Sequence, residues 1–212
     1  MEYTHDVHDE NVLIKAAQAG DLEAFNTLIL RYQNLLFGIA LRMLNDEDTA
    51  SDAVQEALIS VFSKFRTFRG GSLRSWLARV TVNACYDEMR RKRRQRETPL
   101  EQFNINGEEV EDLAWMIDPG ALPDEQYDSY ELESAIQHCL RMLTPAYRDV
   151  VVLVDIEGLS YEEASIATRV PLGTVKSRLA RARLQIRSTL QGYKELLPSN
   201  YVMEMAHPVR IS

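Results

Sequence analysis

Apolar residues recur every three or four positions through most of the chain, and no stretch alternates apolar and polar residues as a half-buried strand does. The first half predicts helices over residues 11–19, 21–44 and 50–65, and a fourth that begins at Leu73. Asp21 and Ser72 are placed to cap the second and fourth of these helices. Asn45 and the pair Gly70 and Gly71 are the expected breaks between them. The pattern therefore predicts an all-α first half.

The second half predicts another group of helices beyond a polar segment. Residues 97–128 combine prolines and glycines with scattered acids, which is typical of a linker, and residues 110–116 allow a short turn of helix within it. Helices resume near Ser129, and Thr144 followed by Pro145 predicts a cap with a first-turn proline. We therefore expect an all-α protein with two small helical domains at 1–96 and 132–192, an acidic flexible linker at 97–131 and a C-terminal tail at 193–212.

Residues 160–187 predict a helix, a tight turn and a second, basic helix, which is the layout of a helix-turn-helix. Ser160 and Glu163 have the spacing of a capping box, so a helix should begin directly after the serine. Pro171 and Gly173 then interrupt the helical pattern. Four apolar residues of the second helix fall on one stripe and should pack inward: Val175, Leu179, Ala182 and Ile186.

The remaining surface of that second helix carries hydroxyl groups and cations. Its residues are Thr174, Lys176, Ser177, Arg178, Arg181, Arg183 and Arg187. A helix with these donors fits the major groove of B-DNA, where arginine bonds guanine with two contacts and serine or threonine reaches bases or phosphates. The pattern favours duplex reading over the alternative of a solvated basic helix.

The net charge of −8 by itself argues against binding to nucleic acid. The charge is unevenly distributed along the chain, however, and the distribution changes this conclusion. Residues 57–96 carry eleven Lys and Arg against two acids, whereas residues 97–133 carry twelve acids and no Lys or Arg. Residues 134–192 carry eight bases and five acids. Local patches decide binding to a polyanion, because charges are screened beyond about 8 Å. Two basic modules therefore flank an acidic connector, which could cover those modules, lie in a basic channel of a partner, or simply be solvated.

The helix from Leu73 is predicted to form a second nucleic-acid surface. Its expected core stripe is Leu73, Leu77, Val80 and Ala84. A second stripe combines aromatic, amide and cationic side chains: Trp76, Arg79, Asn83, Tyr86 and Arg90. Such a surface suits single-stranded nucleic acid, because bases stack on aromatic rings while cations follow the phosphates. The alternative is that Trp76 and the nearby phenylalanines, Phe62, Phe65 and Phe68, are ordinary core residues.

Other classes of function find little support in the sequence. No run of residues is apolar enough to suggest a membrane span, and the acidic start lacks the pattern of a secretory signal, so we expect a cytoplasmic protein. Cys85 and Cys139 predict reduced core thiols. The four histidines show no trustworthy metal-ligand spacing, and no catalytic or nucleotide-binding motif appears. We therefore expect no cofactor, no metal and no enzymatic activity.

Both halves together resemble an extracytoplasmic-function sigma factor of the sigma-70 family. The segments AFNTLILRYQNLLFGIALRML, DTASDAVQEAL, FRGGS and WLARVTVNACYDEMRRKRR resemble region two of that family, and LTPAYRDVVVLVDIEGLSYEEASIATRVPLGTVKSRLARAR resembles region four. The resemblance implies a subunit that binds core RNA polymerase, through the clamp of the largest subunit and the flap of the second-largest. It also implies binding to promoter DNA and control by an anti-sigma factor.

The resemblance assigns roles to residues by their position in these motifs. Polymerase binding falls on Asp52, Gln55 and Glu56. Recognition and melting of the −10 element fall on Phe68, Arg69, Gly70, Gly71, Ser72, Trp76, Arg79, Asn83, Tyr86 and Arg90. Recognition of the −35 element falls on Thr174, Lys176, Ser177, Arg178, Arg181 and Arg183.

One departure concerns the loop before the fourth helix. Many family members have an additional residue between FRG and WL, and commonly a phenylalanine at the position of Leu73, so the resemblance does not fix which −10 base this shorter loop captures. Two other functions stay open on the residues alone. One is an autonomous helix-turn-helix regulator built on residues 160–187, and the other is an RNA-binding or adaptor protein that uses the arginine tract at 90–96.

Overall fold

The all-α expectation is confirmed in the computed structural model, which describes residues 3–97 and 124–196 and contains only helices there. The N-terminal half consists of α1 (Tyr3–Gln18), α2 (Leu22–Leu44), α3 (Glu47–Lys64), the short η1 (Phe65–Thr67) and α4 (Leu73–Glu97). The C-terminal half consists of α5 (Asp124–Met142), α6 (Pro145–Val151), the π-helical turn η2 (Val152–Ile156), α7 (Tyr161–Thr168), α8 (Leu172–Leu190) and the 3₁₀ helix η3 (Gln191–Leu196). The turn of helix expected at 110–116 and the tail beyond Leu196 lie outside the described residues.

Local capping explains several of the helix boundaries. The Asp21 carboxylate accepts hydrogen bonds from the backbone N–H groups of Glu23 and Ala24, so it caps α2 as expected. Asn45 ends α2 in the left-handed region with φ 55°. The expectation for α1 was wrong, because this helix begins at Tyr3 rather than near residue 11. Its early turns are stabilised by polar contacts to α2, such as Asp9 with Arg31 at 2.7 Å, which a search for apolar spacing does not detect.

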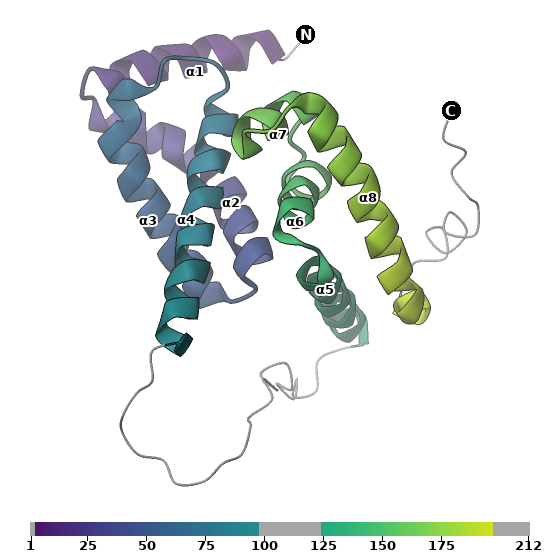
Figure 1. The fold of residues 1–212 in the computed structure, drawn as a ribbon. Coiled ribbons are helices and arrows are strands. Elements are labelled where there is room, and N and C mark those ends of the chain that lie inside the picture. The colour runs from purple at the N-terminus through teal and green to yellow at the C-terminus, as the bar shows by residue number, and fades with distance from the viewer. Residues whose placement is uncertain (1–2, 98–123, 197–212) are drawn as a thin grey trace, which may run out of the picture.

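In the N-terminal half, α2, α3 and α4 run side by side and α1 lies across one end (Figure 1). An aromatic cluster closes this end, with Phe65 at its centre. The Phe65 ring lies 5.2 Å from Phe25, 6.4 Å from Phe68 and 6.0 Å from Trp76 between ring centroids. Phe65 and Phe68 are buried, whereas Phe62 is exposed, so the reading of these phenylalanines as core holds for two of the three.

The C-terminal half confirms the predicted helix-turn-helix. Both hydrogen bonds of the capping box between Ser160 and Glu163 are present, and α7 begins at Tyr161. Gly158, with φ 66°, separates η2 from α7. Thr144 occupies the N-cap position of α6, but its side chain makes no capping hydrogen bond, so that part of the expectation was wrong.

The two halves pack against each other in a closed arrangement that the sequence did not predict. One apolar cluster includes Ile39 and Met43 of α2, Val82 of α4, and Val150 and Leu153 of the C-terminal half. In Figure 1, α6 and α7 lie beside α4, and α7 contacts it directly. Because the apolar cluster is continuous across the boundary, the two helical domains are packed directly against each other.

This packing corrects the predicted core stripe of α4. Leu73 and Leu77 are buried as expected, but Val80 and Ala84 are only partly buried. Ala78, Val82 and Cys85 are buried instead, because α4 is covered by α2 on one side and by the C-terminal half on the other. The other difference is the start of α5, which begins at Asp124 and therefore earlier than Ser129.

Candidate nucleic-acid interface

The recognition surface predicted on α8 faces solvent because the opposite side of the helix, a seam of apolar residues, is buried. Val175, Leu179 and Ala182 are buried and Ile186 is partly buried, which confirms the predicted stripe. On the outer surface, Lys176 and Ser177 are exposed. The seam fixes the rotation of the helix about its axis, so its hydroxyl and cationic side chains are presented together.

The residues of this outer surface are not equivalent. Arg181 is exposed, and Arg178 and Thr174 are partly buried. Arg183 is already paired within the chain, because its guanidinium donates to both carboxylate oxygens of Asp155 at 3.0 and 2.5 Å. The hydrogen bond to Asp155 raises the pKa of Arg183. Arg183 would have to release this carboxylate before it could contact DNA, whereas Lys176, Ser177 and Arg181 need no such change.

The glycine loop before α4 has a special backbone and a buried anchor. Gly70 and Gly71 have φ of 89° and 90°, a region that side chains other than glycine rarely adopt. Arg69 is exposed, but Phe68 is only 7% exposed and packs into the core. The Phe68 side chain therefore anchors the loop to the core and is not available to a base. Ser72 caps α4 by accepting from the N–H of Ser75 at 3.1 Å.

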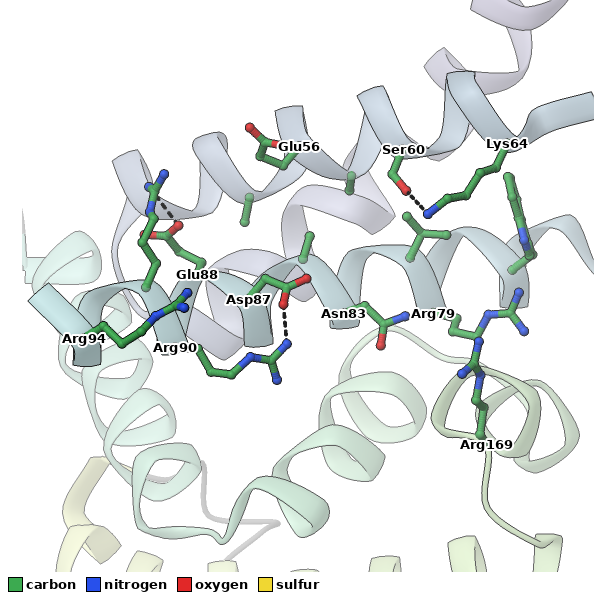
Figure 2. Close-up of a pocket in the computed structure, with 16 residues that line it drawn as sticks. Glu56, Ser60, Lys64, Arg79, Asn83, Asp87, Glu88, Arg90, Arg94 and Arg169 are labelled. Atoms are coloured by element: carbon green, nitrogen blue, oxygen red, sulfur yellow. Dashed lines mark hydrogen bonds and ion pairs between the residues drawn. The ribbon is translucent and has the colours of Figure 1, made fainter.

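The residues predicted as one stripe on α4 are divided between two environments. Trp76, Arg79, Asn83 and Arg90 line a groove of about 700 Å³ between α3 and α4 (Figure 2). Tyr86 instead faces the C-terminal half. Its hydroxyl lies 2.7 Å from each carboxylate oxygen of Asp149 on α6. The groove therefore brings together four of the five predicted residues.

Asp149 is an ionisable residue that the sequence reading missed. It is 9% exposed, and burial raises the pKa of its carboxyl to about 6, although the Tyr86 hydroxyl and the charges of Arg148 and Arg178 act in the opposite direction. Burial also raises the pKa of the Tyr86 hydroxyl. An acid directly before the apolar run from Val150 to Val154 was the available sequence signal, but it did not indicate a partner.

The closed arrangement is held by a second polar cluster at the junction of the glycine loop, α4 and α7. Arg74 donates to the carbonyl oxygens of Glu157 at 2.6 Å and Gly158 at 3.0 Å. It also lies 3.5 Å from the carboxylate of Glu163. Ser72 donates to the same Glu163 carboxylate at 2.9 Å. The glutamate of the capping box thus binds the residue that follows the glycine loop, and no spacing in the sequence indicated this contact.

The residues assigned to polymerase binding lie in a row on α3. Asp52, Gln55 and Glu56 are all exposed. Glu56 also lines the groove between α3 and α4, and the Asp52 carboxylate lies 4.0 Å from Arg91. This face of α3 is directed away from the packed core and is accessible in the closed arrangement.

Within the described part of the chain, no helix is long and apolar enough to cross a membrane, and no group of three or more His, Cys, Asp or Glu residues could hold a metal ion. Cys85 and Cys139 are both buried and unpaired, which confirms the expected core thiols. Burial raises the pKa of both thiols.

Comparisons with known proteins agree with this geometry. The family model Sigma-70 region 2 matches residues 28–95, and Sigma-70, region 4 matches residues 133–186. The RNA polymerase sigma-H factor of Pseudomonas aeruginosa is 31% identical over 84% of this chain and 92% of its own length. The ECF RNA polymerase sigma-E factor of Haemophilus influenzae is 32% identical over 86% of this chain and 95% of its own.

Two solved structures share the fold. CnrH in complex with the cytosolic domain of CnrY has a TM-score of 0.65 at 22% identity, covering 87% of this chain and 98% of that chain. The sigma factor RpoE from Bartonella quintana, in complex with the anti-sigma factor NepR, has a TM-score of 0.57 at 26% identity, covering 79% and 96%. With both family regions matched in order and relatives aligned over most of their length, the chain belongs to the extracytoplasmic-function group of sigma-70 family RNA polymerase sigma factors.

Proposed function

We propose that this sigma factor binds core RNA polymerase through α3 and region 4 and directs it to promoters, with α8 reading the −35 element as duplex. The observation that carries this proposal is the exposed surface of α8, where Lys176, Ser177 and Arg181 project from a helix whose opposite side is buried. Arginine and hydroxyl side chains on a helix of this kind match base edges and phosphates of the major groove. Region 4 therefore supplies the upstream contact.

Region 2 would bind the opened −10 strand through α4 and the loop before it. Asn83 is exposed in the groove, Arg79 is partly exposed, and Trp76 provides an aromatic surface beside them. Stacking and cation contacts of this kind hold single strands. Gly70 and Gly71 lack side chains and so let a base approach the backbone closely.

The closed arrangement is incompatible with reading both elements at once. Elements centred near −35 and −10 are about 25 base pairs apart, which is about 85 Å of duplex at roughly 3.4 Å per base pair. A compact chain of this length has a radius of gyration of only about 17 Å. Since Ser72 of region 2 and Glu163 of region 4 are hydrogen-bonded at 2.9 Å, the two regions must separate when the holoenzyme forms.

The length of the connector allows this separation, because a segment as long as residues 98–123 can reach about 90 Å. The clamp of the largest polymerase subunit would bind Asp52, Gln55 and Glu56, which are exposed before the regions part. The flap of the second-largest subunit would bind region 4. Polymerase would therefore capture the closed form on α3 and stabilise the open one.

We further propose that an anti-sigma factor controls this chain. The Bartonella quintana relative was solved in complex with such a factor. A protein that binds the closed form would prevent the separation that promoter reading requires.

The decisive experiment is reconstituted transcription with core polymerase and a library of promoter fragments. Initiation from a subset that shares two elements about 25 base pairs apart supports the proposal. If the purified chain neither binds core polymerase nor directs initiation from any fragment, the proposal is wrong. Tight operator binding by the chain alone would instead favour the autonomous helix-turn-helix regulator.

A further inference from the structure

The groove between α3 and α4 contains an arrangement of charge that promoter reading by region 2 does not explain. One of its lining residues, Arg169, belongs to region 4 and lies at the end of α7. Figure 2 shows its guanidinium group directed toward that of Arg79 on α4. Two cations from different regions thus meet at the boundary that closure creates.

The two ends of the groove differ in their acids. At one end, Asp87 pairs with Arg90 and Glu88 pairs with Arg91 at 2.8 Å. At the other end, neither Arg79 nor Arg169 has a carboxylate partner among the described residues. Burial lowers the pKa of Arg79, and the charge of Arg169, whose guanidinium group faces it, lowers this pKa further. Closure thus brings together two guanidinium groups that no carboxylate of the described residues pairs with.

The backbone of Arg169 is a second, independent observation. Its φ of 56° lies in the left-handed region, which among the described non-glycine residues only Asn45 shares. Asparagine tolerates this region, whereas an arginine there is uncommon and costs conformational energy. The turn between α7 and α8 thus holds an arginine in an unfavourable conformation that directs it toward another arginine.

We propose that Arg79 and Arg169 form a binding site for a nucleotide phosphate group, complete only when region 4 lies against region 2. Two guanidinium groups from opposite sides can each donate paired hydrogen bonds to phosphate oxygens, and the bound anion removes their mutual repulsion. Trp76 and Asn83 line the same groove and can contact a base through stacking and amide hydrogen bonds. The phosphate comes either from a free nucleotide or from a single DNA strand, and the chemistry of the site is the same for both.

Binding at this site stabilises the closed form. A ligand that requires both arginines binds only when the regions are together, so its binding shifts the population toward closure. A phosphorylated ligand would therefore hold the sigma factor in the form that cannot span a promoter. The site rests on the closed arrangement and shares Trp76, Arg79 and Asn83 with the proposed −10 surface, whereas Arg169 belongs to it alone.

The test uses the full chain without polymerase or promoter, so that its failure leaves the promoter-reading proposal intact. The probes are inorganic pyrophosphate, ATP and a six-nucleotide oligothymidine, and binding is measured by titration calorimetry. Arg169→Asn removes the guanidinium with a residue that accepts left-handed geometry. Arg79→Gln tests the site from the other region. Arg66→Gln is the matched control, because it removes the same single positive charge at an exposed residue of η1 outside the groove.

We expect each groove variant to lose affinity by about tenfold or more, with less than about a twofold change in the control. Binding of pyrophosphate and ATP identifies a free phosphate ligand as the source, and binding of oligothymidine alone identifies the strand. The proposal is overturned if no probe binds, or if Arg169→Asn binds every probe as the wild type does.

Closure is measured in the same samples by fluorescence energy transfer between labels at Leu30→Cys and Leu184→Cys, which are 63% and 64% exposed on α2 and α8. The native thiols are buried, so they label poorly. A bound probe should raise transfer in the wild type and leave it unchanged in Arg169→Asn. Probe binding that lowers transfer would contradict the requirement for closure.

Discussion

The surfaces of α8 and α4 are both proposed to read DNA, but they differ in how many contacts they make within the closed arrangement. On α8, Lys176, Ser177 and Arg181 are exposed, and only Arg183 is held by an internal carboxylate. On α4, Tyr86 is bonded to region 4. The loop before α4 is bonded to region 4 through Ser72. The upstream surface is therefore accessible before polymerase binds, whereas two residues of the downstream surface, Ser72 and Tyr86, are held by region 4.

The largest expected effect comes from the accessible surface. The double variant Arg178→Ala with Arg181→Ala should reduce initiation from a cognate promoter about 100-fold, because each arginine contact to a base contributes about 1–3 kcal/mol of discrimination. Reconstituted transcription on matched promoters with and without the −35 element measures this. Loss should be confined to the promoter that carries the element. Equal loss on both promoters would mean that these arginines stabilise region 4 rather than read DNA.

The next effect concerns the contacts that hold α4 and its loop against region 4. Arg74→Ala removes two hydrogen bonds to region 4 carbonyls and the contact with Glu163, so the open population should rise about tenfold or more, since a charged hydrogen bond contributes about 1.5–3 kcal/mol. Energy transfer between labels at Leu30→Cys and Leu184→Cys measures this in the free chain. Duplex binding by α8 should be unchanged, because its exposed residues make no contact with Arg74. Arg66→Ala is the control, and an unaltered transfer signal would show that Arg74 does not hold the closed form.

The sequence predicted contacts within a few residues far better than contacts across the boundary. The capping box is specified by two residues three positions apart, and it forms as expected. Arg74 and Gly158 are 84 positions apart, and nothing in helical periodicity pairs them. Val80 was assigned to the core because periodicity reports a single buried side, whereas α4 is covered from two. The exposed residues of α8 were found from the sequence because the buried seam that orients them is local.

A smaller effect should follow from pH. Burial raises the pKa of Asp149 to about 6, and burial also raises the pKa of Glu157, so the closed form binds protons more readily than a form in which both carboxyl groups are hydrated. Closure is therefore favoured as the pH falls through 6 and weakened as it rises. The closed-to-open ratio should increase about tenfold between pH 7 and pH 5. The groups that face Asp149 are the Tyr86 hydroxyl and the guanidinium groups of Arg148 and Arg178.

The matching control for this pH effect is Asp149→Asn, which keeps a hydrogen-bond acceptor for Tyr86 but does not titrate. Energy transfer in this variant should vary much less between pH 7 and pH 5, with only the contribution of Glu157 left. A pH profile identical to that of the wild type would assign the effect to other groups. If closure of the wild type were instead favoured at high pH, the closed form would stabilise the ionised form of Asp149.

The smallest expected effect separates the two roles of Glu163. Glutamine preserves the capping box, because its side-chain oxygen can still accept from the N–H of Ser160. Glu163→Gln should therefore leave the thermal stability of α7 nearly unchanged. It removes the charge that Arg74 and Ser72 bind, so the open population should rise by about twofold to fivefold, in line with a partly exposed ion pair. Glu162→Gln, at the exposed neighbouring residue, is the matched control. If Glu163→Gln lowers stability without altering energy transfer, the glutamate acts only as a cap, and closure depends on the carbonyl bonds of Arg74.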